Sequence, residues 1–389
     1  GWGEGLDEAA AYLNDQPDAE NLNVAAWYHD GPFSYFFDGR AVALSSDSPL
    51  FWLNTDYAVL YVNQWQRQSP SPEAIDYFFA REPAHIVREG GMELARIYEL
   101  RGTELPDFVD IARESSADFG NRIRLVGHQL NRLEFQPGEQ IHANLFLQKL
   151  APMDVNYNVQ MRVVGENGQE IGKVDRWPYG APTSDWPVRE MRADGYAIKI
   201  PPETPPGLYQ VNVEFYDPAT LQRLPVTDSV TDELIAEQTR NVALIRVGAA
   251  PEPAQPFGEA FNFADTIALI GADAPAIVGA GETLPLRLYW ESLTPTPTDY
   301  TVFVHVIGPN GEQVAGQDSP PRQGFAATHL WRPGQRIADE LTIPLPAELP
   351  AGAYEIRTGL YTLDGGRLPL VRDGEIVGDY AVADTFEVP

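Results

Sequence analysis

Apolar residues in the first hundred positions follow helical spacing in some segments and strand spacing in others. Leu6, Ala9, Ala10 and Leu13 recur at i, i+3, i+4 and i+7, which predicts an amphipathic helix. The run YAVLYV at 57–62 is apolar throughout, as in a strand that is covered on both faces.

A second helix and further strands are expected in the same segment. Ser71 is a candidate N-cap, Pro72 suits the first helical position, and an apolar stripe follows it. Strands are expected at 24–28, 85–87 and 92–100, the last two joined by a Glu-Gly-Gly turn. Strands that alternate with helices predict a small α/β domain at 1–102.

Two stretches have the composition of connections between domains. Residues 103–119 are polar and acidic without a sustained hydrophobic period, so we expect a linker there. Residues 249–257, with the sequence AAPEPAQPF, are expected to form a stiff, extended linker.

The segments 120–248 and 258–389 repeat each other with an offset of about 144 residues, which is the length of a domain rather than of a solenoid unit. The matches span about 100 residues of each copy. They include IRLVG at 123–127 with IALIG at 267–271, Trp186 with Trp331, PGLY at 206–209 with AGAY at 351–354, and RLP at 223–225 with RLP at 367–369.

Each copy has the pattern of an all-β domain. Residues 159–164 and 170–171 alternate around a glycine turn, and 302–307 with 313–314 do the same in the second copy. Short alternating runs separated by Gly and Pro turns predict an immunoglobulin-like sandwich. The fold class expected is therefore multidomain: a small α/β domain followed by two tandem immunoglobulin-like antiparallel β-sandwiches.

Charge and composition exclude several classes of partner and site. The chain has 56 Asp and Glu against 27 Lys and Arg, a net charge of −29, which disfavours nucleic acid and anionic lipid as partners. It has no cysteine, so disulfides, Fe–S clusters and cysteine-ligated zinc are excluded. Its 34 prolines are above the usual share and suit many turns.

Motifs of catalysis and metal binding are missing. No two of the six histidines are spaced at i, i+3 or i+4, and there is no GxSxG, P-loop or HExxH sequence. No catalytic residue and no cofactor are therefore assigned. Calcium is a minor alternative for so acidic a chain, although no EF-hand loop occurs.

Aromatic side chains on expected loops are the better candidates for ligand binding, because exposed Trp and Tyr rings can stack on sugar faces. The candidates in the first sandwich are Trp177, Tyr179 and Trp186, with Trp290, His329 and Trp331 as rough counterparts in the second. For Trp186 and Trp331, which match in the repeat, packing under a loop is the favoured alternative.

Three stretches resemble the soluble C-terminal region of bacterial family 39 glycosyltransferases, which are frequent in Chloroflexi and are similar to dolichyl-phosphate-mannose protein mannosyltransferases. These stretches are GWGEGLDEAAAYLN at 1–14, TDYAVLYVNQWQRQ at 55–68, and HIVR at 85–88 with ARIY at 95–98. The resemblance covers about residues 1–102. The two sandwiches are similar, more loosely, to modules appended to such enzymes and to sugar-binding sandwich modules of polysaccharide exporters.

The resemblance implies a function for the parent chain and not a catalytic residue here. Enzymes of this family transfer sugar from a polyprenyl-phosphate donor through a membrane part that this sequence does not contain. This chain is then expected to be non-catalytic, to lie on the extracytoplasmic face of the membrane or at the cell surface, to dock on the transmembrane catalytic part, and to position acceptor or glycan. An autonomous carbohydrate-binding protein and a structural β-sandwich protein of the cell envelope are the alternatives.

Overall fold

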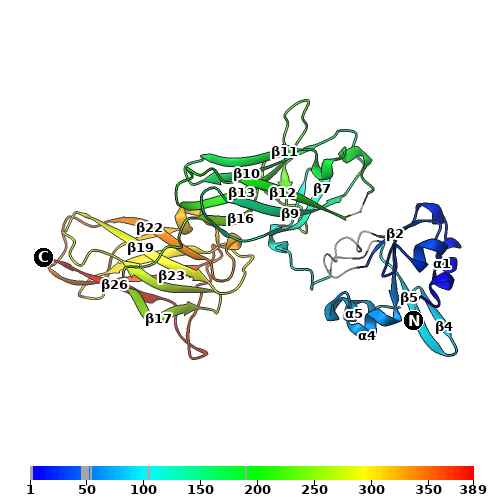
Figure 1. Ribbon diagram of the computed structural model, residues 1–389. Helices are drawn as coiled ribbons and strands as arrows, with labels where there is room; N and C mark the ends of the chain where they lie inside the picture. The colour runs from blue at the N-terminus through cyan, green and yellow to red at the C-terminus, as the bar shows by residue number, and fades with distance from the viewer. Residues whose placement is uncertain (1–2, 45–51, 53–54, 102, 104–105, 189–190) are drawn as a thin grey trace.

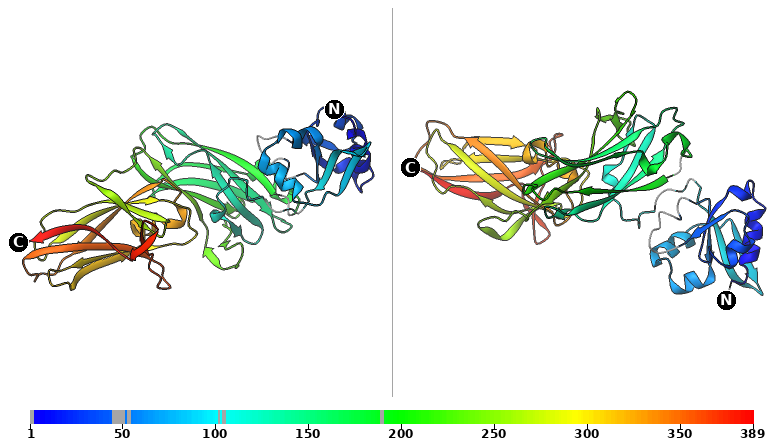
Figure 2. Two further views of the ribbon diagram at one scale, coloured as in Figure 1. Left: turned by 90° about the horizontal axis from the view of Figure 1, so that it is seen from below. Right: turned by 45° about the horizontal axis from the view of Figure 1, so that its top comes forward.

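The computed structural model describes residues 3–44, 52, 55–101, 103, 106–188 and 191–389, which form three consecutive bodies (Figures 1 and 2). The α/β domain lies at one end, and the C-terminal sandwich lies at the other. The fold class is confirmed: a small α/β domain precedes two tandem immunoglobulin-like sandwiches. No described helix is long and apolar enough to cross a membrane.

The α/β domain is one five-stranded sheet with helices on both faces. Its strands run in the order β2-β1-β3-β5-β4, with β1–β2 and β1–β3 parallel and the other pairs antiparallel. The elements are α1 (Leu6–Asn14), β1 (Asn23–Ala26), α2 (Pro32–Phe36), β2 (Arg40–Ala43), β3 (Tyr57–Tyr61), α4 (Val62–Arg67), α5 (Pro72–Phe79), β4 (His85–Glu89) and β5 (Met92–Glu99), with the 3₁₀ turn η1 (Ala19–Asn21).

Both predicted helices are confirmed by their contacts. The stripe of α1 is fully buried, and the Ser71 hydroxyl accepts the Ala74 N–H at 3.2 Å to cap α5. Every residue of β3 is buried, as expected for a strand covered on both faces. The expected strand at 57–62 ends one residue earlier, because the Gln64 side chain accepts the Tyr61 N–H and helix α4 begins at Val62.

The first sandwich packs two sheets around one core. One sheet has the order β12-β9-β7-β6-β14-β15 and the other β11-β10-β13-β16-β8. The elements are η2 (Arg113–Ser115), β6 (Ala117–Phe119), β7 (Ile123–Leu130), β8 (Glu134–Phe135), β9 (Gln140–Lys149), β10 (Asn158–Gly165), β11 (Glu170–Arg176), η3 (Pro178–Gly180), η4 (Thr183–Asp185), β12 (Met191–Lys199), β13 (Gly207–Tyr216), β14 (Val226–Thr227), β15 (Leu234–Ala236) and β16 (Arg240–Val247).

The second sandwich repeats most of this plan, although β8 and η2 have no counterpart among its named elements. Its sheets run β22-β19-β18-β17-β24-β25 and β21-β20-β23-β26. The elements are β17 (Pro256–Phe263), β18 (Ile267–Asp273), β19 (Thr283–Ser292), β20 (Thr301–Ile307), β21 (Gln313–Ser319), η5 (Pro321–Gly324), η6 (Thr328–Leu330), β22 (Arg336–Pro344), β23 (Gly352–Tyr361), β24 (Leu370–Arg372), β25 (Glu375–Gly378) and β26 (Ala381–Val388).

Matched tyrosines close the same corner in both sandwiches. The Tyr209 hydroxyl donates to the Pro205 carbonyl at 2.8 Å, and the Tyr354 hydroxyl donates to the Pro350 carbonyl at 2.7 Å. This four-residue reach is the tyrosine corner of immunoglobulin-like folds. The repeated Pro-Gly-x-Tyr and Ala-Gly-x-Tyr sequences are thus explained by a turn that each copy must make.

The two predicted linkers contain more structure than their composition suggests. Within 103–119, Val109 is buried in the α/β domain, Ala112 pairs with His128 of sandwich 1, and β6 is a strand of that sandwich. In the second linker, β17 already begins at Pro256. Short pairing partners of this kind carry no hydrophobic period of their own, so the sequence pattern missed them.

Candidate functional site

The structure separates the six aromatic and histidine candidates into buried and exposed groups. Trp186, Trp290 and Trp331 are 3%, 0% and 1% exposed and belong to the sandwich cores. A sugar ring cannot reach these faces, so their interpretation as stacking residues is wrong. For Trp186 and Trp331 the packing alternative is confirmed.

Trp290 is part of a strand rather than of a loop. It lies in β19, where it packs against Phe263 with ring centroids 6.0 Å apart. The strand is apolar at alternate positions, and Trp290 occupies an inward one. Trp331 follows η6, and its indole N–H donates to the Ala326 carbonyl at 2.8 Å.

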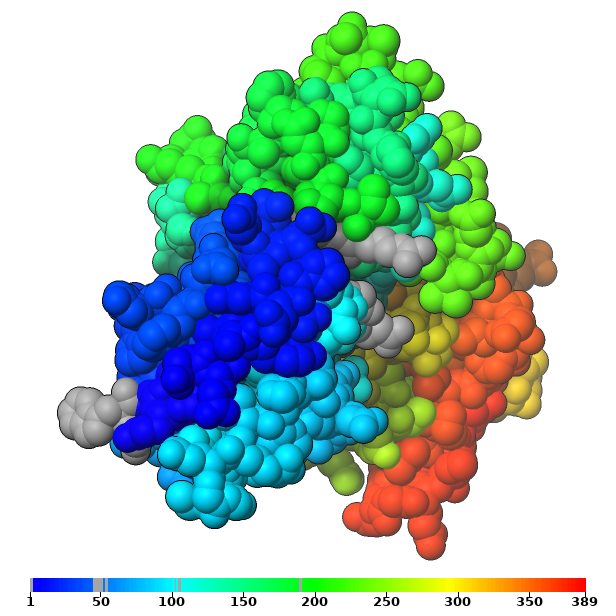
Figure 3. All heavy atoms as spheres, turned by 90° about the vertical axis from the view of Figure 1, so that its right-hand side faces the viewer, coloured from blue at the N-terminus to red at the C-terminus, as the bar shows by residue number. Residues whose placement is uncertain are grey.

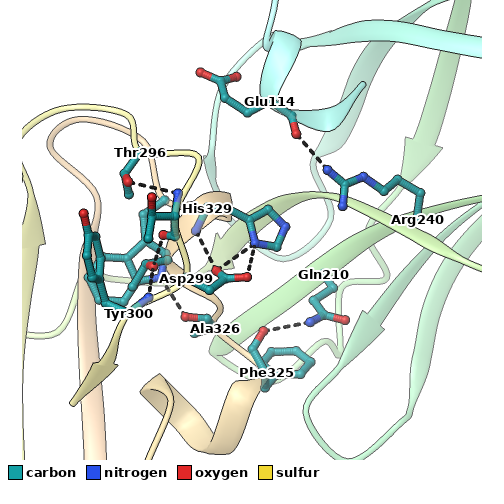
Figure 4. Close-up of polar contacts among 12 residues, drawn as sticks. Glu114, Gln210, Arg240, Thr296, Asp299, Tyr300, Phe325, Ala326 and His329 are labelled. Atoms are coloured by element: carbon teal, nitrogen blue, oxygen red, sulfur yellow. Dashed lines mark hydrogen bonds and ion pairs between the residues drawn. The ribbon is translucent and has the colours of Figure 1, made fainter. Parts of the chain in front are cut away.

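His329 lies at the junction of the two sandwiches and is ion-paired rather than free. Its Nδ1 is 2.9 Å from Asp299 Oδ1, and its backbone N–H donates to the same oxygen (Figure 4). Burial acts against ionisation of Asp299, yet the contacts with His329 hold the pKa of that carboxyl below its usual value. The pair fixes the 296–300 loop against η6, and the His329 side chain is only 18% exposed.

Trp177 and Tyr179 remain exposed, each at 45%, and stand on the turn between β11 and β12. Tyr179 has a left-handed backbone conformation with φ of 58°, which costs a non-glycine residue about 1 kcal/mol or more. The conformation is held because the Tyr179 N–H donates to Asp194 Oδ2 at 2.7 Å. We call Trp177, Tyr179 and Val188, which is 44% exposed, the aromatic end of sandwich 1.

The buried Asp194 carboxylate lies under this turn and accepts its hydrogen bonds. It is 4% exposed and also accepts hydrogen bonds from the Tyr196 hydroxyl and from Arg176 at 2.7 Å. Burial and the Asp194 charge raise the pKa of Tyr196 well above its usual value, so the phenol stays a donor. The carboxylate is therefore saturated with donors, and the turn above it is rigid.

Arginine side chains line the aromatic end. The Arg192 guanidinium carbon lies 4.7 Å from the Tyr179 ring centroid and 5.9 Å from that of Trp186. Arg176 donates to the Trp177 carbonyl at 2.8 Å. Rings supported by guanidinium groups on a rigid turn can stack on a flat apolar face, and hydroxyls of the same ligand would meet polar groups at the edge.

Sequence reasoning overlooked Asp194, Val188 and Arg192. Asp194 could have been found from the sequence, because it matches Asp339 at the repeat offset. In sandwich 2 the Arg322 N–H donates to Asp339 Oδ1 at 2.8 Å, as Tyr179 does to Asp194. Among the described residues no group of three or more His, Asp or Glu is placed to hold a metal ion.

The junction between the sandwiches is the other polar cluster. Gln335 Nε2 donates to the Leu244 carbonyl at 2.6 Å, and Arg246 donates to the Arg336 carbonyl at 2.6 Å. Figure 4 shows a third contact, in which Gln210 Nε2 donates to the Phe325 carbonyl at 2.7 Å. Leu244 belongs to sandwich 1 but is buried in the core cluster of sandwich 2. The outer face of β13 and β16 thus receives the η5–η6 end of the next domain.

The same junction holds a buried neutral histidine. His128 Nδ1 lies 2.8 Å from the Ser115 hydroxyl oxygen. Burial, with the nearby charges of Arg332 and Arg240, lowers the pKa of His128 to about 3. Arg240 donates to the Glu114 carbonyl at 2.7 Å on the same side. These contacts bind the 113–115 turn to sandwich 1 and form no nucleophile–base arrangement with a third orienting carboxylate.

Comparisons with known proteins add only a likeness of fold. No family model matches the chain, and no curated protein matches it. Among solved structures it is similar to the C-terminal domain of Wzt, with 7% identity over 36% of this chain and 81% of that chain at a TM-score of 0.25. It is also similar to a CARDB domain from Pyrococcus furiosus solved with di-metal ions, with 17% identity over 36% of this chain and 97% of that chain at a TM-score of 0.20.

Proposed function

We propose that this chain is the non-catalytic extracytoplasmic region of a membrane glycosyltransferase that uses polyprenyl-phosphate sugars. In this proposal the region docks on the transmembrane catalytic part and positions the acceptor or glycan. The family rests on the resemblance of residues 1–102, and the positioning role rests on the aromatic end of sandwich 1.

One observation carries the glycan-binding part. Trp177 and Tyr179 are exposed aromatic rings on a turn that a buried, donor-saturated Asp194 holds in place. Large rings exposed on a rigid polar turn are costly to leave in water and are suited to stacking on the apolar face of a sugar. Because Trp186, Trp290 and Trp331 are buried in the cores, Trp177 and Tyr179 are the aromatic candidates that remain for the platform.

A glycan array with purified protein tests the platform directly. Saturable binding is expected, with loss of most affinity in Trp177→Ala and in Tyr179→Ala. Tyr380→Ala is the matched control, because Tyr380 is 38% exposed and Arg357 lies 4.9 Å from its ring centroid. Binding that survives both platform changes, or that falls equally in the control, would refute the assignment.

A turnover assay tests the non-catalytic part. The chain incubated with a polyprenyl-phosphate sugar and an acceptor peptide or glycan is expected to give no product. Product formation above a heat-denatured control would contradict the proposal, whatever the glycan array shows.

A structural role in the cell envelope is the second candidate, and the inter-sandwich junction favours it. The junction buries Leu244 and adds ion pairs between Arg322 and Glu166 at 2.5 Å and between Arg336 and Glu252 at 2.5 Å. Such a rigid pair would serve as a spacer. Filaments or lattices of the purified chain in the electron microscope, without glycan binding, would favour this role over positioning.

A further inference from the structure

The segments that lead into the two sandwiches, 103–119 and 249–257, each pass over the same position of the β7 or β18 strand. Gly127 in β7 lies under Ile111 and Ala112, and Gly271 in β18 lies under Pro253. A Cβ on Gly127 would come within 2.8 Å of the Ile111 side chain, and one on Gly271 within 2.5 Å of Pro253. The repeated glycine is therefore required because the incoming chain runs directly across the sheet.

In sandwich 2 the turn that follows β21 contacts the domain that comes before it in the chain. Arg322 has φ of 52°, its N–H is held by Asp339, and its guanidinium group pairs with Glu166 of sandwich 1 at 2.5 Å. The backbone carbonyl of Phe325, three residues farther, accepts a hydrogen bond from Gln210 of sandwich 1. The η5–η6 end is thus the docking end of sandwich 2.

The matching turn of sandwich 1 has the same backbone and a different surface. Tyr179 corresponds to Arg322, and Asp194 corresponds to Asp339, by sequence offset, backbone conformation and hydrogen bond. Where sandwich 2 presents an ion-pairing arginine, sandwich 1 presents Trp177, Tyr179 and Val188, three large apolar side chains that are each close to half exposed. This surface has the composition of an interface core.

The chain that enters sandwich 1 keeps the α/β domain close to this end. Val109 is buried in the α/β domain, and Ala112 is paired with His128, so only two residues separate the two attachments. His128, Leu145 and Asp194 lie in register across β7, β9 and β12. At about 4.8 Å per strand, the point of attachment is about 14 Å from the carboxylate under Tyr179.

The side of the α/β domain that faces sandwich 1 is also determined. Phe108 and Ile111 pack against the cluster that contains α5, so the α5 side is the tethered side. In Figure 1 α5 is the helix of this domain drawn nearest to the sandwiches, and Figure 3 shows the α/β domain in front when the molecule is viewed from that end. Phe79 at the end of α5 is 42% exposed.

We infer that the aromatic end of sandwich 1 is an intramolecular docking surface for the α/β domain. Each sandwich would then contact the domain that precedes it in the chain through the same end, as sandwich 2 contacts sandwich 1 through its η5–η6 end. A two-residue tether gives the α/β domain a high effective concentration at this end, so a modest apolar contact suffices. Docking would bring the α5 side of the domain over Trp177 and Tyr179, which are each 45% exposed in the arrangement that the structure describes. As a consequence that rests on the proposed function, a glycan must displace the α/β domain to reach the platform, which makes the contact autoinhibitory.

Photo-crosslinking in the full chain tests the docking without any ligand. p-Benzoylphenylalanine is placed at Tyr179 and at Val188 in separate proteins, and at Tyr380 as the control. Irradiation is expected to join positions 179 and 188 to peptides of residues 3–101 in a product of monomer mass, with at least tenfold less such product from position 380. Equal yields from position 380, products only of dimer mass, or no product with residues 3–101 would overturn the inference.

Distance measurements give an independent test, because the chain contains no cysteine other than those introduced. Spin labels at Met92→Cys in the α/β domain and Leu221→Cys in sandwich 1, both well exposed, report the separation of the two bodies. A narrow distribution is expected in the parent protein and a broader one with Trp177→Ser and Tyr179→Ser together. The same width in both proteins, or equal broadening with Tyr380→Ser, would refute docking at this end.

The two proposals fail in different ways. Crosslinks to residues 3–101 together with no binding on the glycan array would support the docking inference and refute the proposed glycan binding. If glycan binds on the array but saturating glycan does not lower the crosslink yield, the glycan platform would be supported and the autoinhibitory contact would be refuted.

Discussion

The two sandwiches use different residues to donate hydrogen bonds to the carbonyl oxygens of the same turn. The turn before β12 or β22 points several carbonyl oxygens inward, and a cation must satisfy them. In sandwich 1 the buried Lys149 ammonium donates to the carbonyls of Thr183, Ser184 and Trp186 at 3.2, 2.8 and 2.8 Å. In sandwich 2 position 292 is serine, and Arg332 donates to the carbonyls of His329 and Trp331 at 3.2 and 3.1 Å.

The outer faces of the two copies differ for a reason that lies in their neighbours. Leu208, Gln210, Leu244 and Arg246 in sandwich 1 receive sandwich 2. The paired positions of β23 and β26 hold Ala353, Glu355, Thr385 and Glu387, of which all but Glu355 are exposed. The outer face of β23 and β26 is therefore polar and largely exposed, where that of β13 and β16 is covered by sandwich 2. The comparison shows that the framework was kept while each surface was fitted to its place in the chain.

The largest expected effect comes from removing the cation of sandwich 1. Lys149→Met leaves three buried carbonyls without their donor, so the free energy of unfolding of sandwich 1 should fall by about 3 kcal/mol. Denaturant unfolding followed by tryptophan fluorescence measures it. Lys173→Met, whose side chain is 54% exposed in a 3.9 Å ion pair, should change stability by less than about 0.5 kcal/mol. Equal losses in the two variants would mean that the buried hydrogen bonds do not explain the effect.

The next effect tests the junction. Leu244→Ala removes a fully buried side chain from the interface and should cost about 2–3 kcal/mol, and the two sandwiches should then melt as separate transitions in calorimetry. Thr385→Ala at the matched, exposed position of sandwich 2 should leave the melting profile unchanged. A single cooperative transition in both proteins would show that the coupling does not depend on Leu244.

The matched carboxylates should respond with opposite signs. Burial raises the pKa of Asp339 to about 6, and its Oδ2 has no hydrogen-bond partner. The folded state therefore disfavours the charged form, so a stability penalty begins above the unfolded pKa near 3.8 and is complete above pH 6. Asp339→Asn should raise the free energy of unfolding by about 1–2 kcal/mol at pH 7.5, with no gain at pH 3.5.

Asp194 lies at the matched position and accepts from Arg176, Tyr196 and Tyr179. Asp194→Asn breaks a buried ion pair and should lower the free energy of unfolding by about 2 kcal/mol at pH 7.5. Denaturant titrations of both variants at the two pH values compare the signs. Loss of stability in both at pH 7.5 would contradict the difference between the two sites.

The smallest effect concerns the ion pair across the junction. The Arg322 and Glu166 side chains are 20% and 38% exposed, so Glu166→Gln should cost only about 0.5–1 kcal/mol, and less at 0.5 M salt. A double-mutant cycle with Arg322→Gln isolates the pair. Glu259→Gln, in an exposed pair with Arg372, should have no measurable effect. A cost above 2 kcal/mol, or one that salt does not reduce, would indicate that Glu166 does more than pair with Arg322.

Local pattern predicted most of the fold because the elements concerned carry their own signals. Helix α5 has a serine cap, a proline at its first position and an apolar stripe, and the β10–β11 hairpin has alternating strands around a glycine. Helix α2 and strands β2 and β6 escaped prediction because they are three to five residues long and gain their stability from neighbours. The candidate site was predicted less well, since Trp186 and Trp290 look like Trp177 until burial is known.

The sequence by itself determined the order of one α/β domain and two matched β-sandwiches, because hydrophobic period, turn residues and the repeat offset are local or linear properties. Only the tertiary structure decided which aromatic rings are exposed and which copy receives the other. Burial depends on what packs against a residue from elsewhere in the chain. The Tyr179 turn and the Arg322 turn share a backbone, yet only the second meets a neighbour through Glu166. That difference, invisible in the repeat alone, leaves the aromatic end of sandwich 1 open.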